Sequence, residues 1–551
     1  MGKWWKDVVG YQIYPSVFND SNNDGHGDIN GISDKLEYLK DLGIGLIWVG
    51  PIYRSPKVDN GYDVSDFYNI DESYGTLDDV KNMLAKAKSL GIRVIFDLVL
   101  NHTSSKHEWF IDACNNVDSK YRDYYIFKDP NDEGGRPNNW KGFFEESVWT
   151  YVPKINKYYM HIFSKEMPDL NWDNKELRQE MYKVARYWLD MGVDGFRLDA
   201  IAHLAKDKTF RDSKAYKDDL VYDPSKFSNR KELFKYLKEF KKEVLDHYDC
   251  VTIGEVGGCA TTDEALKYSN YKTGYFNMVF NFDTCWENGA YGSIDKSDSE
   301  IKTNVYNLKL LFEKWYKDID EKAWLPLYWL NHDHPRVVSQ YGDIYYRKES
   351  AKMLGLTLLF MYGTPFIYQG EEIGMSNVNH KSLDMFKDVN AVNIINEYKD
   401  KYTEKEILRF LNRASRDNAR SLMQWSSNQV NHGDFYLNEN YKVVNVEDNL
   451  KDKDSILNFY KKIIDLRNNE YHDEAVYGKF KLIYRKNKDV FAYQKIKDKK
   501  IMVISNFRDY IVNFRDYVSE NKIIMHNYKD VMVVNNKLVL RPFECYLIEI
   551  I

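Results

Sequence analysis

Eight short runs of apolar and β-branched residues recur along the first two thirds of the chain, with amphipathic stretches between most of them. The runs at residues 93–100 (RVIFDLVL) and 364–370 (TPFIYQG) are typical of strands buried on both faces. The stretches at 77–91 and 175–192 repeat apolar residues with helical spacing. Alternating strands and helices pair in parallel, and eight such units predict an α/β fold, a closed (β/α)8 TIM barrel. The other six runs are residues 8–15, 45–51, 193–198, 251–256, 275–282 and 325–330.

Two parts of the chain lack this rhythm. The stretch after the third run is rich in tryptophan, tyrosine and turn residues, among them DPNDEGGRPNN. A connection this long is usually functional, so we expect a small domain inserted after strand three. Near the C-terminus the sequence alternates apolar and polar residues (KFKLIY, DVFAYQKI), which predicts an antiparallel β-sandwich. The expected division is 1–103 and 169–476 for the catalytic barrel, 104–168 for the inserted domain and 477–551 for the C-terminal sandwich.

Composition narrows the class of protein. The net charge of −6 gives no basic face for nucleic acid or an anionic membrane. The five cysteines are scattered and none has metal-ligand spacing, which is typical of free thiols in a reducing compartment. The N-terminus lacks the pattern of a secretory signal, and no apolar run reaches about 18 residues. We therefore expect a cytoplasmic protein with no nucleic-acid or membrane partner.

Acidic residues end four of the strand-like segments: DLVLNH, GFRLDA, TIGEV and LNHDH. In GFRLDA, Arg197 and Asp199 are two residues apart and share one face of a strand. A guanidinium there should hold the carboxylate ionised. Enzymes that break glycosidic bonds use an ionised Asp beside a protonated carboxyl. In barrels of this kind, the catalytic residues lie at the C-terminal ends of the strands.

These motifs, with MPDLNW and GTPFIYQGEEIGM, follow the order found in the α-amylase superfamily, glycoside hydrolase family 13. Over its whole length the chain resembles the oligo-1,6-glucosidase and α-glucosidase branch. The resemblance implies that Asp199 is the nucleophile, Glu255 the general acid/base and Asp333 a transition-state clamp. It implies a two-step reaction with retention, in which the two reacting carboxyls lie about 5–5.5 Å apart. The apolar neighbours Ile253 and Val256 fit the raised pKa that Glu255 needs as an acid.

The same resemblance also implies which residues form the sugar-binding pocket. His102 and His332 match histidines that bind sugar hydroxyls, and Asp59 and Tyr62 match residues that hold the terminal ring. Arg416 matches an arginine that closes the pocket with Asp59, which implies action on chain ends. Arg197 belongs to the same set, Asp97 is expected to support it, and Phe163 and Phe282 are candidate rim aromatics whose alternative is core packing.

Two positions bear on the linkage. In this branch, the residue after the nucleophile tends to be Val in α-1,6-specific enzymes and Thr or Ala in α-1,4-acting ones, so Ala200 favours maltose-type bonds. A change of this size is worth only about 1–3 kcal/mol. Met167 stands where the branch usually has Gln and cannot donate a hydrogen bond, which indicates an outlying member.

The resulting prediction is a retaining, exo-acting α-glucosidase on short oligosaccharides that leans to α-1,4 bonds. Its alternatives are an oligo-1,6-glucosidase, a trehalose-6-phosphate hydrolase, or a sucrose isomerase or transglucosidase. A remote alternative is a non-catalytic relative of transporter heavy chains, which need a transmembrane segment. A monomer or weak homodimer is expected.

A metal loop is predicted near the N-terminus, in DSNNDGHGD. Oxygen ligands alternate around glycine there, as in loops that bind hard cations. Members of the branch carry Ca²⁺ or Mg²⁺ at the matching loop, so one structural ion and no organic cofactor are expected; the alternative is an Asx-rich turn without metal. The candidate ligands are Asp20, Asn22, Asp24, Asp28 and the backbone carbonyl of His26.

Overall fold

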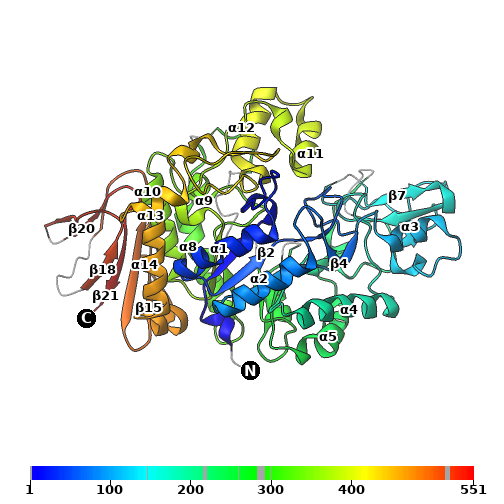
Figure 1. Ribbon diagram of the computed structural model, residues 1–551, viewed down its shortest axis with the longest axis horizontal. Helices are drawn as coiled ribbons and strands as arrows, with labels where there is room; N and C mark the ends of the chain where they lie inside the picture. The colour runs from blue at the N-terminus through cyan, green and yellow to red at the C-terminus, as the bar shows by residue number, and fades with distance from the viewer. Residues whose placement is uncertain are drawn as a thin grey trace. The chain divides into compact units, whose positions relative to one another are not determined.

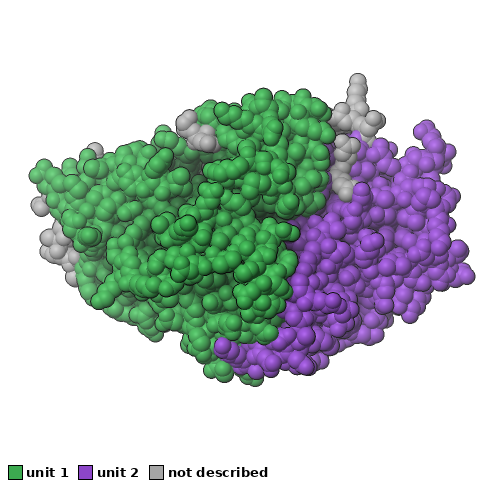
Figure 2. Space-filling view, turned by 45° about the horizontal axis from the view of Figure 1, so that its top comes forward, with its two compact units in different colours: residues 1–47, 87–92, 282–551 green, residues 48–86, 93–281 purple. Residues whose placement is uncertain are grey.

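The computed structural model describes residues 3–144, 147–214, 220–257, 260–281, 292–297, 300–514, 522–535 and 537–550. The chain divides into two compact units, shown in green and purple in Figure 2. Unit 1 contains residues 1–47, 87–92 and 282–551, and unit 2 contains residues 48–86 and 93–281. Each unit is described by itself.

All eight predicted strands are present and form one sheet in the order β11-β10-β9-β5-β2-β1-β13-β12. Every strand pair with a recorded register in this sheet is parallel, as the alternation of strands and helices predicts. The strands are β1 (Gly10–Ile13), β2 (Leu46–Val49), β5 (Arg93–Val99), β9 (Gly195–Asp199), β10 (Val251–Glu255), β11 (Met278–Phe280), β12 (Pro326–Leu327) and β13 (Thr364–Tyr368).

Unit 2 aligns the strand ends that carry acidic residues. Asp97 of β5 pairs in register with Arg197 of β9, and Arg197 pairs with Ile253 of β10. Helix α4 (Lys175–Met191) is fixed at its start by Asn174, whose side chain accepts from two backbone N–H groups. It ends at Gly192 in the left-handed conformation that glycine favours. The other elements are β3 (Tyr53–Arg54), β4 (Asp66–Ile70), α2 (Leu77–Ser89, which ends in unit 1), α5 (Leu233–Glu243) and α6 (Thr262–Ser269).

The predicted insertion after the third strand is a small antiparallel sheet with its own core. The sheet has the order β6 (Phe127–Lys128), β8 (Lys157–Met160), β7 (Trp149–Val152), and α3 (Glu108–Asn115) precedes it. Trp140 and Trp149 pack in its core, together with Phe227 from beyond the insertion. The tryptophans that mark this stretch in the sequence are therefore packing residues.

In unit 1, α10 (Arg347–Leu359) is buried on all sides from Ser350 onward. It packs against α14 (Ile456–Asn468) and against strands β16 and β21 of the C-terminal sheet. The hydroxyls of Thr357 in α10 and Ser505 in β16 lie 2.7 Å apart. This central helix explains why the C-terminal sheet is a fixed part of unit 1. The other helices described in this unit are α1 (Ile29–Leu42), α8 (Val305–Ile319), α9 (Val337–Tyr341), α11 (Val389–Tyr398), α12 (Glu404–Ala414) and α13 (Val446–Lys451).

The C-terminal region is antiparallel, as its alternating sequence predicts. Its main sheet has five strands in the order β14-β15-β16-β21-β18, and a smaller sheet has the order β17-β20-β19 (Figure 1, orange to red). Val490, Ile504, Leu540 and Tyr546 share one core between them. The strands are β14 (Lys479–Ile483), β15 (Val490–Ile496), β16 (Lys500–Asn506), β17 (Val512–Asn513), β18 (Lys522–His526), β19 (Val533–Val534), β20 (Lys537–Leu540) and β21 (Cys545–Glu549).

Candidate active site

Arg197 is the centre of the acidic cluster in unit 2. Its Nη1 lies 2.6 Å from Oδ1 of Asp97 and 2.6 Å from Oδ1 of Asp199. Its Nη2 lies 3.0 Å from Oε1 of Glu255. The guanidinium is buried, 5.2 Å from the ring centre of Trp48. One fixed cation therefore orients the predicted nucleophile, the predicted acid/base and the predicted supporting aspartate.

Ala200 ties the end of β9 to Glu255. Its backbone has φ 47° and ψ 29°, in the left-handed region. In this conformation its N–H donates to Oε2 of Glu255 at 2.9 Å. Glu255 is thus held at both carboxylate oxygens, one by Arg197 and one by the peptide that follows Asp199.

The pKa of Asp199 is not simply lowered by Arg197, contrary to the expectation from the sequence. Burial is the largest influence and raises the pKa of Asp199 well above its ordinary value. Arg197 opposes this rise, whereas the charges of Glu255 and Asp97 add to it. Three carboxyls face one guanidinium, so the cluster is stabilised by keeping one proton. A pair with one protonated and one ionised carboxyl is what retaining hydrolysis requires.

His102, also in unit 2, has a ring nitrogen without a hydrogen-bond partner among the described residues. The residue is buried, and this nitrogen is Nε2. Burial, helped by the charge of Lys206, lowers the pKa of His102 to about 3, so the ring is neutral. A buried, unsatisfied polar atom is rare in native proteins, and a sugar hydroxyl would satisfy this one.

The predicted ring-binding residues Asp59 and Tyr62 are both buried in unit 2. The Tyr62 hydroxyl donates to Oδ2 of Asp97 at 3.2 Å, so Tyr62 belongs to the Arg197 cluster. The ring of Phe163 lies 5.4 Å from that of His102, edge to face. Phe282 lies outside the described residues.

Sequence reasoning missed a buried lysine in unit 2. Nζ of Lys206 lies 2.9 Å from Oδ2 of Asp169 and donates to Oδ1 of Asn101 at 2.9 Å. Asn101 precedes His102, and Asp169 follows the MP pair that contains the buried Met167. The sequence contains a sign of this lysine, because it ends the apolar segment IAHLAK. A lysine that is buried with such a segment needs a charged or polar partner.

In unit 1, His332 and Asp333 follow β12 and contact each other. Nε2 of His332 lies 3.3 Å from Oδ2 of Asp333. Nδ1 of His332 lies 2.8 Å from Nε2 of Gln12, and the ring stacks on Tyr14 with 5.6 Å between centres. An amide nitrogen only donates, so Nδ1 accepts and Nε2–H points at Asp333. Gln12 thereby sets the tautomer that holds this carboxylate.

Two arginines clamp two carboxylates in unit 1. Arg416 and Arg420 reach Oδ1 of Asp333 at 3.1 Å and 3.0 Å. The same arginines reach Oδ2 of Asp388 at 2.8 Å and 2.5 Å. Burial alone raises the pKa of Asp388, but the two arginines outweigh it and the pKa is lowered. Sequence reasoning found Arg416 but missed Arg420 and Asp388, although two arginines four apart in SRDNAR are a visible signal. The predicted pair of Arg416 with Asp59 joins residues of different units and stays a prediction.

The predicted metal loop is held by its own side chains. Asp28 caps α1 by accepting from the Gly31 N–H at 2.6 Å. Asp20 accepts from the Asn23 N–H at 2.7 Å, and Asp24 accepts from the His26 N–H at 2.8 Å. Within the described ranges, no three His, Cys, Asp or Glu side chains gather as a metal shell. The oxygen donors nonetheless fit a hard cation, because carboxylate and amide oxygens are its preferred ligands.

No helix in the part of the chain that the structure describes is long and apolar enough to cross a membrane.

Comparisons with known proteins agree over nearly the whole chain. The family model "Alpha amylase, catalytic domain" matches residues 12–478. The oligo-1,6-glucosidase of Bacillus cereus is 42% identical over 98% of this chain and 98% of its own length. The trehalose-6-phosphate hydrolase of Bacillus licheniformis has a TM-score of 0.91, 36% identity and full coverage of both chains. The isomaltulose synthase of Protaminobacter rubrum has a TM-score of 0.90 and 34% identity, again over both full chains. Matches of this extent confirm the α-amylase fold. The chain belongs to the α-amylase family, glycoside hydrolase family 13, and is a glycosidase.

Proposed function

We propose that the protein is an exo-acting oligo-1,6-glucosidase that releases α-glucose from isomaltose-type oligosaccharides. The observation that carries the reaction type is the Arg197 cluster, in which one guanidinium holds Asp199 and Glu255 at the ends of neighbouring strands. Two carboxyls fixed on neighbouring strand ends suit a retaining double displacement, in which one attacks and the other carries the proton.

In the proposed first step, a carboxylate oxygen of Asp199 attacks the anomeric carbon while Glu255 gives its proton to the departing glycosidic oxygen. The glycosidic bond breaks, and a covalent β-glucosyl enzyme forms. In the second step, Glu255 takes a proton from water, whose oxygen displaces Asp199 and yields α-glucose. Both carboxyls return to their starting protonation states, because water supplies a hydroxyl to glucose and a proton that replaces the one given to the leaving group.

The remaining predicted site residues receive roles as substrate binders. His102 supports this role through its unsatisfied Nε2, which is placed to meet a sugar hydroxyl. His332 and Asp333 support it as a contacting pair whose motif resembles the family's residues for hydroxyl binding and transition-state stabilisation. Exo-action is proposed from Asp59, Tyr62 and Arg416, which match the residues that close the branch's pocket.

The comparisons favour the α-1,6 alternative over the α-1,4 preference inferred from Ala200. The Bacillus cereus relative that aligns end to end is named an oligo-1,6-glucosidase. Ala200 is weak evidence by contrast, since a change of one or two methyl groups is worth only about 1–3 kcal/mol. The trehalose-6-phosphate hydrolase neighbour supports a second candidate substrate, trehalose 6-phosphate.

A substrate panel tests this proposal: kcat/KM on isomaltose, maltose, sucrose, trehalose and trehalose 6-phosphate. The proposal expects isomaltose to exceed maltose by about tenfold or more, since one pocket contact gives about 10–200-fold. A preference for maltose would restore the α-1,4 assignment. Turnover of trehalose 6-phosphate alone would replace the substrate while leaving the catalytic residues in place.

The finer sequence predictions also remain proposals. One structural Ca²⁺ or Mg²⁺ at the Asp20 to Asp28 loop is supported by its alternating oxygen donors. The domain bounds, the monomer or weak homodimer and the cytoplasmic location stay as predicted from the sequence.

A further inference from the structure

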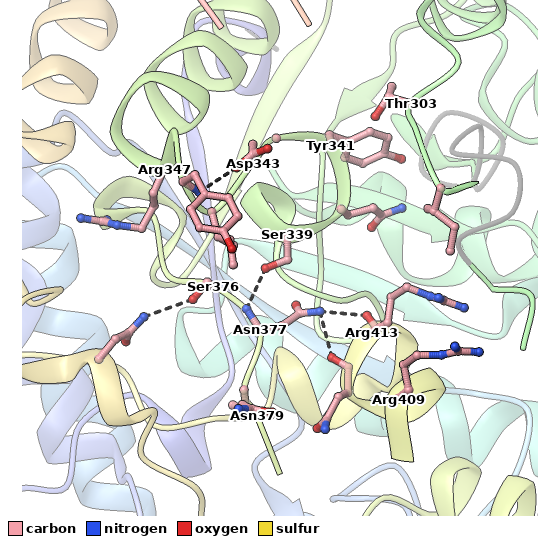
Figure 3. Close-up of a pocket in the computed structure, with 18 of the residues that line it drawn as sticks. Thr303, Ser339, Tyr341, Asp343, Arg347, Ser376, Asn377, Asn379, Arg409 and Arg413 are labelled. Carbon is pink, nitrogen blue, oxygen red and sulfur yellow. Dashed lines mark hydrogen bonds between the residues drawn. The ribbon is translucent and has the colours of Figure 1, made fainter. Parts of the chain in front are cut away.

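A large cavity lies in unit 1 and contains none of the proposed catalytic or sugar-binding residues. Its volume is about 1150 Å³. Its walls come from α9, from α12, from the segment after β13 and from residues near the C-terminal sheet. Figure 3 shows this cavity with Ser339 of α9, Asn377 after β13 and Arg409 of α12 among its lining residues. The space is ample for a monosaccharide derivative, since small-molecule pockets are typically about 300–1,000 Å³.

The lining is strongly basic, in contrast to the rest of the chain. Seven lysine and arginine residues line it, against two aspartates, Asp343 and Asp509. The whole chain has 78 basic and 84 acidic residues. Basic residues in this excess focus a positive potential into a concave space and attract anions. The seven are Lys302, Arg347, Lys381, Lys405, Arg409, Arg413 and Arg508.

Several of these cations form no ion pair among the described residues. Arg508 is paired with Asp489 at 2.8 Å. Arg409 feels the charge of Glu406, but its recorded hydrogen bond goes to the carbonyl of Ile294, at 3.4 Å, and its buried Nε has no hydrogen-bond partner among the described residues. Within the described ranges, the side chains of Lys381 and Lys405 also form no ion pair. Figure 3 shows Arg409 and Arg413 extending side by side from α12. Arg413 donates to the carbonyls of Lys296 and Ser293, at 3.2 Å and 2.6 Å, so Arg409 and Lys405 are the cations of α12 that remain for an anion.

The lining also has groups suited to the uncharged part of a sugar. The Tyr345 side chain is 91% exposed, and Val443 is 71% exposed, so apolar surface faces solvent at this cavity. Four asparagines, Asn377, Asn379, Asn412 and Asn440, add amide groups. Aromatic and apolar surface with a few polar groups is the usual make-up of a small-molecule site.

We propose that this cavity is a second ligand site, which binds a sugar phosphate. The phosphate is held by Arg409 with the neighbouring lysine Lys405, and the sugar packs on Tyr345. The planar guanidinium of arginine donates charge-assisted hydrogen bonds that suit the several acceptor oxygens of a tetrahedral phosphate. The site is independent of the proposed α-1,6 specificity, because it shares no residue with the catalytic cluster.

The test is calorimetric titration of the full-length protein with glucose 6-phosphate and, separately, with inorganic phosphate. Arg409→Gln and Lys405→Gln should each weaken glucose 6-phosphate binding by about tenfold, the loss of one charge-assisted contact. Lys399→Gln is the matched control, because it removes one exposed cation between α11 and α12 that does not line the cavity. It should change the dissociation constant less than twofold. Melting temperatures of all variants check that they are folded.

Two further variants test where the ligand binds and which part of it is recognised. Asp199→Asn should bind glucose 6-phosphate as tightly as the unmodified protein, whereas loss of binding would place the ligand at the catalytic cluster and overturn the proposal. Tyr345→Ala should weaken glucose 6-phosphate binding but leave phosphate binding unchanged. Equal affinity for phosphate and glucose 6-phosphate, or an equal loss in Arg409→Gln and Lys399→Gln, would also overturn the proposal.

Discussion

Arg197 and Glu255 form an ion pair, with 3.0 Å between Nη2 and Oε1, while the other arm of the same guanidinium contacts Asp199. The two carboxyls of the proposed reaction are thus oriented by one planar group. A planar fork can hold two partners at fixed angles, whereas an ammonium group acts as a point charge. The geometry of the cluster therefore depends on arginine rather than on positive charge alone.

Arg197→Lys should lower kcat by about 100-fold or more and destabilise the protein by roughly 3–5 kcal/mol, because it leaves buried carboxylates without a partner. Urea unfolding and steady-state rates measure the two effects. Arg54→Lys is the control, because Arg54 is half-exposed and forms a 3.6 Å pair with an exposed glutamate. Its effect should stay below about 1 kcal/mol. Activity within threefold of the unmodified protein in Arg197→Lys would contradict the proposed role.

Asp199→Asn and Glu255→Gln should fail in different ways. The first removes the nucleophile and should lower kcat by about 10³-fold or more on every substrate. The second removes the proton donor, so isomaltose hydrolysis should fall far more than release of nitrophenol from a nitrophenyl α-glucoside, whose leaving group needs little protonation. Rates on both substrates measure the difference. Equal losses on both substrates in Glu255→Gln would contradict its assignment as the acid.

Position 200 should respond to backbone strain as well as to linkage. Ala200 has φ 47°, a region in which glycine is relaxed and β-branched residues are outliers. Ala200→Gly should therefore be neutral to stabilising by up to about 1 kcal/mol, and Ala200→Val should destabilise by about 1–2 kcal/mol. Calorimetric melting compares the three proteins. A valine variant as stable as the unmodified protein would show that the backbone relaxes here.

The stability of the protein should depend on pH through Glu371. Burial, together with the charge of Glu372, raises the pKa of Glu371 from 4.5 to about 8. The folded protein therefore holds a proton that the unfolded chain releases, so this stabilisation is full below pH 4.5 and is lost as pH rises through about 8. Glu371→Gln should lose less stability than the unmodified protein between about pH 5 and about pH 8. Urea unfolding at both pH values gives the comparison, and parallel losses in the two proteins would contradict the raised pKa.

Metal removal should destabilise the protein if the Asp20 to Asp28 loop binds its proposed ion. A chelator should lower the melting temperature, and excess Ca²⁺ or Mg²⁺ should restore it, because a ligand that binds only the folded state stabilises it. Asp24→Asn should remove most of this response. Glu37→Gln, which changes an exposed residue of α1, should keep it. An identical melting temperature with and without chelator would favour the Asx-rich turn without metal.

The sequence predicted every strand of the eight-stranded sheet because strands buried on both faces appear as unbroken apolar runs. It also predicted the antiparallel C-terminal region, because strands with one exposed face alternate apolar and polar residues. The pairing of Arg197 with Asp97 could be anticipated, because both belong to motifs of the family that the sequence resembles. Local patterns carry this kind of information well.

Other features depend on tertiary contacts that no local pattern encodes. Lys206 pairs with Asp169, and Arg420 with Asp388, each across more than thirty residues of sequence. The left-handed backbone of Ala200 has no compositional signal, because alanine usually avoids it. The raised pKa of Asp199 was unpredictable for the same reason: it arises from burial and from neighbours that only the fold brings together.

Unit 2 lies between the segments of unit 1 in the sequence, so the ribosome completes unit 2 first. All residues of unit 2 have been synthesised by residue 281, whereas unit 1 needs its first 47 residues and also residues 282–551. At about 5–20 residues per second, the N-terminal segment waits roughly 15–50 s for its partners. During this interval strand β1 has its neighbour β2 but lacks β13, and helix α1 lacks α14, against which they finally pack. The nascent chain therefore exposes its earliest strand for the longest time, and chaperones that bind apolar segments have their main opportunity there.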